Sequence, residues 1–215
     1  MRLRPYQERA IADLRNAYAS GARAPCLTLP TGAGKTIIAA EIIRLAVARG
    51  TRVLFLAHRE ELLAQTVTKL RDAGIDSIRL IRAHIDTGAR DAPVVVASVP
   101  TLTRWGDRCP EAGLVVIDEA HHVVADTWLE IAKRHAGAKL LGLTATPQRA
   151  DGRALGDVFD RLVIGATVNE LTELGHLVPC RVLAPPESLR SKQMALDPLE
   201  AYEQHTPGEK AVAFC

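Results

Sequence analysis

Residues 29–36 read LPTGAGKT, and this stretch decides the fold class of the chain. An apolar run precedes it and a run with helical period follows it, which predicts a glycine-rich turn between a buried strand and a helix. Backbone N–H groups in such a turn, with the helix dipole behind them, can hold a phosphate. The stretch departs from the strict phosphate-loop pattern, because Leu29 stands where its first glycine is expected. The residues predicted to bind the phosphates are Thr31, Gly32, Ala33, Gly34, Lys35 and Thr36.

A second stretch, residues 114–121, reads LVVIDEAH. Four apolar residues predict a buried strand, which delivers Asp118 and Glu119 at the carboxyl edge of a sheet, where ligands bind in open α/β folds. We expect Asp118 and the Thr36 hydroxyl to bind Mg²⁺, and Glu119 to orient or deprotonate a water. With Lys35 as the cation on the phosphates, these residues predict nucleoside-triphosphate hydrolysis; two merely solvated carboxylates are the alternative.

Helical and strand-like periods alternate with short connections along the chain, which predicts an α/β, doubly wound and mostly parallel sheet. The segments expected to be helices are residues 5–21, 36–49, 59–72, 126–135 and 168–174. The segments expected to be strands are residues 26–29, 52–57, 78–82, 94–98, 114–118, 139–143, 161–164 and 178–183.

Composition limits the location and the partners of this protein more than it limits the reaction that it catalyses. The net charge is only +2, so any surface for nucleic acid must be local rather than a global basic field. The four cysteines form no C-x-x-C pair, and no apolar run approaches the roughly 18 residues of a membrane span. We therefore expect a cytoplasmic protein. His121 and His122 have no Cys or Asp at the spacing of a zinc site.

Six segments in order resemble the motifs of the first RecA-like domain of a DEAH-box helicase of superfamily 2. They are residues 3–7 (LRPYQ), 29–36, 56–62 (LAHREEL), 97–102 (ASVPTL), 118–121 (DEAH) and 144–147 (TATP). The run LTATPQR at residues 143–149, followed by Asp151 and Gly152, is most similar to the branch that contains type III restriction subunits and phage-like helicases. The resemblance spans residues 3–147. A P-loop kinase or a transporter ATPase matches less well, because neither explains His121 or residues 144–146.

This resemblance implies roles that the residues alone do not. It implies a RecA-like P-loop domain with ATP and Mg²⁺ as cofactors, and a contact between Gln7 and the adenine. The residues that it places along the nucleic-acid backbone are His58, Arg59, Ser98 and Thr101; those that it makes couple the nucleotide state to a second domain are His121, Thr144 and Thr146. The implied partner is DNA, double-stranded rather than single-stranded, with RNA less expected. Pro100 replaces a polar residue of the relatives, which weakens one expected phosphate contact.

The same resemblance predicts the domain organisation. We expect an ATP-binding RecA-like domain over residues 1–184, a linker over 185–204 that begins at a Pro-Pro pair, and the start of a second RecA-like domain over 205–215. That second domain supplies an arginine finger in the family, worth roughly 10³–10⁵ in rate in related hydrolases. We therefore expect an ATP-dependent DNA helicase or translocase motor that does not unwind DNA alone, and the missing half is either lost by truncation or supplied by a separate chain. The alternative is a truncated nucleotide-binding module without turnover.

Overall fold

The computed structural model describes residues 2–57, 60–122, 131, 133–147, 155–179, 202–203 and 207–208. The chain divides into two compact units, Met1–Val178 and Pro179–Cys215. In the second unit the described residues are Pro179, a short helical piece at 202–203 and a turn at 207–208. The predicted domain boundaries at residues 184 and 204 lie outside the described residues and stay predictions.

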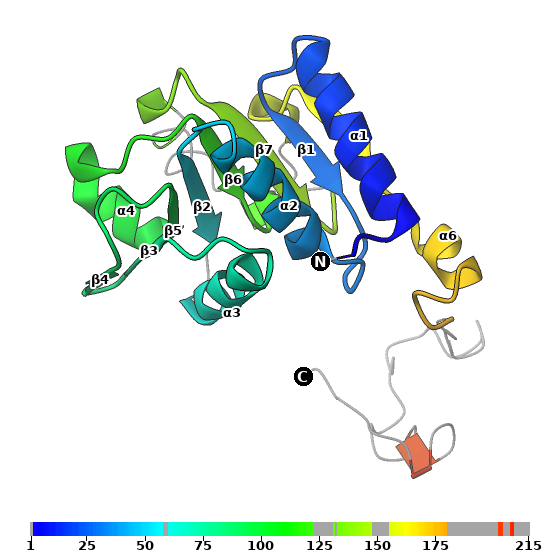
Figure 1. Cartoon of the computed structure of the whole chain (residues 1–215). Helices are drawn as coiled ribbons and strands as arrows, with labels where there is room; N and C mark the ends of the chain where they lie inside the picture. The colour runs from blue at the N-terminus through cyan, green and yellow to red at the C-terminus, as the bar shows by residue number, and fades with distance from the viewer. Residues whose placement is uncertain are drawn as a thin grey trace, which may run out of the picture. The chain divides into compact units, whose positions relative to one another are not determined.

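The first unit is built on one sheet of eight strands (Figure 1). They are β1 (Pro25–Thr28), β2 (Val53–Ala57), β3 (Ile78–Arg82), β4 (Ile85–Thr87), β5 (Val94–Ser98), β6 (Leu114–Ile117), β7 (Lys139–Thr144) and β8 (Arg161–Ile164). Their order across the sheet is β4-β3-β5-β2-β6-β7-β1-β8, and all neighbours pair in parallel except β3 and β4. The predicted α/β class with a mostly parallel sheet is confirmed.

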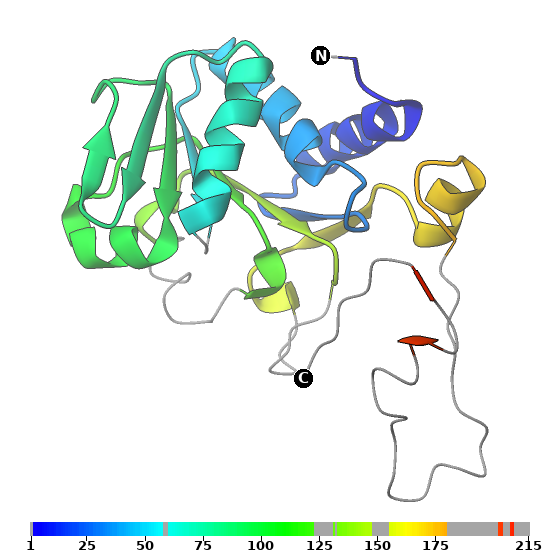
Figure 2. The same cartoon turned by 90° about the horizontal axis from the view of Figure 1, so that it is seen from below.

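Helices cover the sheet because its central strands are apolar on both sides. The helices are α1 (Pro5–Ala19), α2 (Lys35–Val47), α3 (Glu60–Asp72), α4 (Val99–Trp105) and α6 (Val168–Glu173), with short 3₁₀ turns η1 (Gly106–Arg108), η2 (Ala120–His122) and η3 (Leu155–Asp157). Along β2, Val53 and Phe55 join the core under α1, α2 and α3, which lie along one face in Figure 2. Leu54 and Leu56 alternate with them and join the core with α4 on the other face. This arrangement confirms a doubly wound fold.

Two elements were not predicted from the sequence, β4 and α4. All three residues of β4 are exposed, so no apolar run marked it, and it forms only as the antiparallel partner of β3. The helix α4 begins where Ser98 accepts the Thr101 N–H, with a proline in its first turn, which are ordinary helix-start signals. We had assigned that segment to ligand contacts instead of to a helix.

Two other predicted elements lie mostly outside the described residues. Of the helix at 126–135, the described residues Ile131, Lys133 and Arg134 are helical. Of the strand at 178–183, the described residues are Val178 and Pro179, and neither is in a strand. No helix among the described residues is long and apolar enough to cross a membrane.

Candidate nucleotide-binding site

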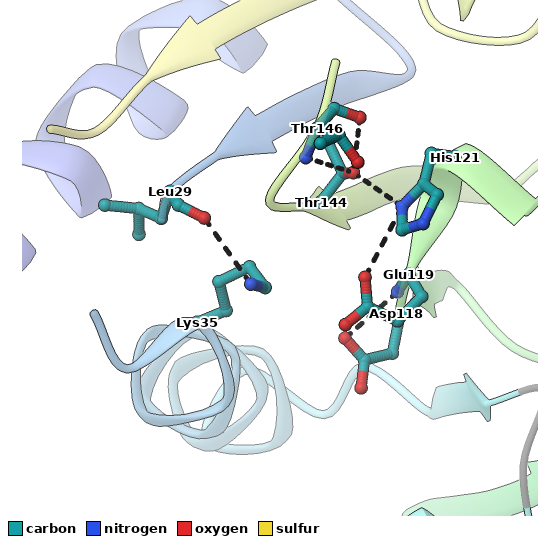
Figure 3. A network of polar contacts seen from close by, with 7 residues as sticks. All are labelled: Leu29, Lys35, Asp118, Glu119, His121, Thr144 and Thr146. Carbon is teal, nitrogen blue, oxygen red and sulfur yellow. Dashed lines mark hydrogen bonds and ion pairs between the residues drawn. The ribbon is translucent and has the colours of Figure 1, made fainter. Parts of the chain in front are cut away.

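Three neighbouring strands bring the two decisive stretches of sequence to one edge of the sheet. β7 lies between β1 and β6, and all three run parallel. Thr28 at the end of β1 is in register with Thr144 at the end of β7, and Ile117 at the end of β6 is in register with Gly142. The glycine-rich turn, Thr144 and the acidic pair therefore follow strands that end side by side (Figure 3).

The glycine-rich loop, residues 30–34, requires glycine at its last position. Gly34 has a φ of +84° and is the N-cap residue of α2. A Cβ atom at this position would lie 2.7 Å from the Gln7 Nε2 atom, so a side chain would have to displace the Gln7 amide and would also strain the backbone. The Lys35 ammonium makes one long hydrogen bond, 3.4 Å, to the Leu29 carbonyl at the base of the loop. Lys35 is therefore beside the loop with a weak neutral partner.

The acidic pair lies opposite this lysine. Figure 3 shows Asp118 and Glu119 on the β6 side and Lys35 on the α2 side of the same region. Burial, and after it the neighbouring Glu119 charge, raise the pKa of Asp118, against smaller opposing effects of the Glu119 N–H, Lys35 and Lys69. The Asp118 Oδ1 atom accepts the Glu119 N–H at 3.1 Å, and Glu119 has a φ of +50°, unusual for a residue with a side chain.

A histidine links the acidic pair to β7. The His121 Nδ1 atom lies 2.9 Å from Thr144 Oγ1 and 3.4 Å from Glu119 Oε2. The Thr144 hydroxyl donates to the Thr146 carbonyl at 2.8 Å and accepts the Thr146 N–H at 3.2 Å. Since its proton is used there, Thr144 Oγ1 accepts from a protonated His121 Nδ1. The predicted coupling residues His121, Thr144 and Thr146 thus form one network that ends on Glu119.

The donor set fits a magnesium-bound triphosphate. Burial, and after it the Glu119 charge, raise the pKa of Asp118, and a bound cation would favour its ionised form. Thr36, in the first turn of α2, and Asp118 could supply oxygen ligands, with phosphate oxygens completing the shell. Within the described residues, no three His, Cys, Asp or Glu side chains are grouped closely enough to hold a metal by themselves.

Gln7 is buried below the loop and already hydrogen-bonded. It is 3% exposed; its Oε1 atom accepts the Arg4 N–H at 2.9 Å, and its Nε2 atom donates to the Ala33 carbonyl at 3.2 Å. Its amide therefore supports the loop, and a contact with adenine stays a prediction.

Ser98 and Thr101 are not at the surface. They are 1% and 6% exposed, and their hydroxyl oxygens lie 2.6 Å apart. Thr101 Oγ1 also accepts the Ala83 N–H at 2.9 Å, so this pair holds the β3–β4 turn against the start of α4. Their expected contact with a nucleic-acid backbone stays a prediction that these buried hydroxyls do not favour. His58 and Arg59 lie outside the described residues.

Sequence reasoning missed two residues beside the loop, Tyr6 and His176. The Tyr6 hydroxyl donates to the Ala33 carbonyl at 2.8 Å, and the His176 ring contacts the Tyr6 ring. The motif at residues 3–7 could have drawn attention to Tyr6, which we expected only to pack in the core. His176 follows α6, far along the chain, and carried no sequence signal; we expected it to be a surface or packing residue.

Comparisons with known proteins agree with this geometry. The family model described as "Type III restriction enzyme, res subunit" matches residues 1–149. The chain is 28% identical over 206 residues to the 51.5 kDa protein of a Lactococcus phage (isolate 7-9), covering 86% of this chain and 42% of that protein. It is 32% identical over 191 residues to the putative ATP-dependent helicase IRC3 of Saccharomyces cerevisiae, covering 80% of this chain and 27% of that protein.

A solved structure shows the same fold. The UvsW helicase from bacteriophage T4 superposes with a TM-score of 0.63 at 21% identity, over 76% of this chain and 60% of that chain. This chain spans less than half the length of the two curated relatives above. The family match confirms the predicted resemblance to type III restriction subunits, the solved structure agrees with the fold, and the chain belongs to the family of the type III restriction enzyme res subunit.

Proposed function

We propose that this chain is the ATP-binding and ATP-hydrolysing motor domain of a DNA helicase or translocase. The observation that carries the proposal is the convergence of three adjacent strand ends on one site. They bring together the Lys35 ammonium, the crowded pair Asp118 and Glu119, and the His121–Thr144 link. A lysine suits the phosphates of a magnesium-bound triphosphate, and carboxylates suit its Mg²⁺ and the attacking water.

Each residue of the site has a distinct part in hydrolysis. The loop N–H groups and Lys35 hold the phosphates, while Thr36 and Asp118 hold Mg²⁺, which neutralises phosphate charge when it is bound. Glu119 orients a water and accepts its proton. His121 holds the Glu119 carboxylate from the other side and links its position to Thr144 and Thr146 on β7.

The proposed polymer partner is DNA, and duplex DNA rather than a single strand. Supporting this choice is the family, because restriction enzymes act on DNA. The strand ends of β2 and β5 lie on the same edge as the nucleotide site, and His58 and Arg59 directly follow β2. With few phosphate contacts, binding should be weak, and its logarithm should fall by roughly 0.9 per contacted phosphate against the logarithm of salt concentration. A second RecA-like domain on a separate chain, and a cytoplasmic location, stay predictions.

The experiment measures three properties of the purified chain: MgATP binding, phosphate release with and without duplex DNA, and strand displacement. We expect binding, slow phosphate release with little stimulation by DNA, and no unwinding, since the arginine finger is expected on the second RecA-like domain. Binding without any phosphate release would favour the alternative, a nucleotide-binding module. Failure to bind MgATP would overturn the proposal, and unwinding by this chain alone would overturn the need for a second domain.

A further inference from the structure

One carbonyl of the glycine-rich loop accepts two side-chain donors from α1. The Ala33 oxygen lies 2.8 Å from the Tyr6 hydroxyl and 3.2 Å from Gln7 Nε2. Both donors are nearly inaccessible, at 2% and 3% exposure. Because each donor is fixed by packing, the direction of this carbonyl is fixed as well.

The direction of the Ala33 carbonyl sets the direction of the next amide. In a planar trans peptide, the C=O of one residue and the N–H of the next point to opposite sides. The Gly34 N–H therefore points away from Tyr6 and Gln7. Within the described part of the chain, the N–H groups of Gly34, Lys35 and Thr36 donate to no acceptor. These unpaired donors at the start of α2 are the groups that a phosphate would use.

A turn from the end of the first unit covers Tyr6 and the loop from outside. The His176 ring lies against the Tyr6 ring, with centroids 5.5 Å apart and planes tilted by 50°. The Leu177 Cδ2 atom lies 3.6 Å from the position that a Cβ of Gly32 would take. The His176 and Leu177 N–H groups both donate to the Leu171 carbonyl, at 2.8 and 3.0 Å, which closes the turn after α6.

The element that carries this turn is itself held to α1. Arg9 donates to the Gly165 carbonyl at 3.1 Å and pairs with Glu170 at 2.5 Å. Leu171 of α6 is fully buried in the core shared with α1 and α2. The turn at residues 175–177 therefore rests on a support that is independent of the loop.

We infer that Tyr6 and His176 are positioning residues for phosphate binding: the Tyr6 hydroxyl orients the Ala33–Gly34 peptide, and the His176 ring holds Tyr6 in place. The inference rests on the proposed function, because it gives the turn at residues 175–177 a part in phosphate binding at the same site. Since the peptide faces phosphates, both residues act on the triphosphate portion of the ligand and not on the base.

Tyr6→Phe tests the first half of this inference, with inorganic tripolyphosphate and MgATP titrated separately. The variant keeps the ring and loses one buried hydrogen bond, so both affinities should fall about threefold to tenfold. Tyr18→Phe is the matched control. The Tyr18 hydroxyl also donates to a carbonyl, that of Leu140 at 2.7 Å, but at the opposite end of α1. The control should lose similar stability and keep both affinities.

His176→Ala tests the second half. It should weaken binding of both ligands by a similar factor, and His176→Phe, which retains a ring against Tyr6, should restore it. Leu174→Ala, at the exposed residue directly before the turn at residues 175–177, is the control and should change neither affinity.

The outcomes separate this inference from the proposed function. If the wild-type chain binds neither ligand, the proposed function fails and the inference with it. If the wild type binds both, and Tyr6→Phe and His176→Ala behave like their controls, the positioning role alone is overturned. A loss of MgATP affinity with unchanged tripolyphosphate affinity also overturns it, because the two residues would then contact the base.

Discussion

Charged groups at the two edges of the sheet differ in whether their interactions favour the charged form. At the edge where the strands end, burial and the Glu119 charge raise the pKa of Asp118, and Glu119 adopts a strained backbone conformation. At the edge where the strands begin, charged groups have matched partners. Asp160 accepts the N–H groups of Arg23 and Ala24 at 2.6 and 3.1 Å, and both ring nitrogens of His135 lie 2.9 Å from backbone carbonyls.

This difference indicates that the first edge holds a functional site and that the second edge stabilises the fold. Two nearby carboxylates and an unusual φ cost folding energy and persist where a ligand or a reaction uses them. Groups whose partners all come from the protein itself add stability instead. We therefore expect changes at the carboxyl edge to alter nucleotide chemistry, and changes at the amino edge to alter stability.

The largest expected effect is at Glu119. The substitution Glu119→Gln keeps the shape of the side chain and removes its basicity, so phosphate release should fall by about 10²–10⁴ while MgATP affinity is retained. Single-turnover phosphate release, beside equilibrium binding, measures both. If the variant releases phosphate at the wild-type rate, Glu119 takes no part in hydrolysis, and the assignment of a functional site to the carboxyl edge is contradicted.

His135 gives the next largest effect, at the other edge. A hydrogen bond with Cys109, followed by the carbonyls of Pro110 and Ile131, raises the pKa of this buried histidine to about 9. A raised pKa means that the folded state holds the proton more tightly, so the added stability is complete below about pH 6.5 and is lost as the pH rises through about 9. The loss should reach up to about 3 kcal/mol.

Denaturant unfolding of the wild type and of His135→Gln, from pH 6 to pH 10, measures this loss. The variant should be less stable at pH 6 and should show a flatter dependence on pH. Its MgATP affinity at pH 7 should equal that of the wild type. Parallel pH profiles for the two proteins would show that His135 carries no such stabilisation.

Two threonines near the carboxyl edge, Thr144 at the end of β7 and Thr101 after β5, test whether the effect on chemistry is confined to the residues of the site. Thr144→Val breaks the link to His121 and should lower the DNA-free ATPase kcat about tenfold, the equivalent of one hydrogen bond of roughly 1.4 kcal/mol. Thr101→Val leaves the Ala83 N–H without its partner and should cost about 1–2 kcal/mol of stability with the DNA-free kcat unchanged. Equal effects of the two variants on kcat would contradict the separate roles.

The smallest expected effect is a gain in stability. Asp118→Asn removes a carboxylate whose ionised form is disfavoured, so without ligand the variant should be slightly more stable than the wild type at pH 8. A raised pKa means that wild-type stability falls as the pH rises through it, so the gain should shrink in acid, where Asp118 is protonated. Thermal unfolding with and without MgATP checks this, because the variant should also lose stabilisation by MgATP. A variant less stable than the wild type at pH 8 would show that the ionised Asp118 carboxylate is not disfavoured in the folded state.

Elements with a strong apolar run were predicted well from the sequence. The bounds of β3, β5 and β8 agree to the residue, because each run is set off by polar or turn-forming neighbours. The exposed strand β4 has no such run, since its formation depends on pairing with β3.

For the site, sequence predicted which residues follow the buried strands, but not how the edge is organised. The position of β7 between β1 and β6, which connects Thr144 to His121, arises from the order of strands in the sheet. The burial of Ser98 and Thr101 depends on the β3–β4 turn, and the contact of His176 with Tyr6 joins residues 170 positions apart. Such long-range contacts leave no periodic signal in one sequence.

Isothermal titration of MgATP into the wild-type chain and into Lys35→Ala tests the central claim most directly, namely that the carboxyl edge around β1, β6 and β7 is a nucleotide site. Among the described residues, the Lys35 ammonium donates to the Leu29 carbonyl over a long 3.4 Å, a weak bond that phosphate oxygens can replace. Each charge-assisted hydrogen bond that it makes is worth roughly 1.5–3 kcal/mol, so its loss should abolish measurable binding. The wild type should bind MgATP saturably, and the variant should show no binding. Equal affinity of the two proteins for MgATP would contradict the claim.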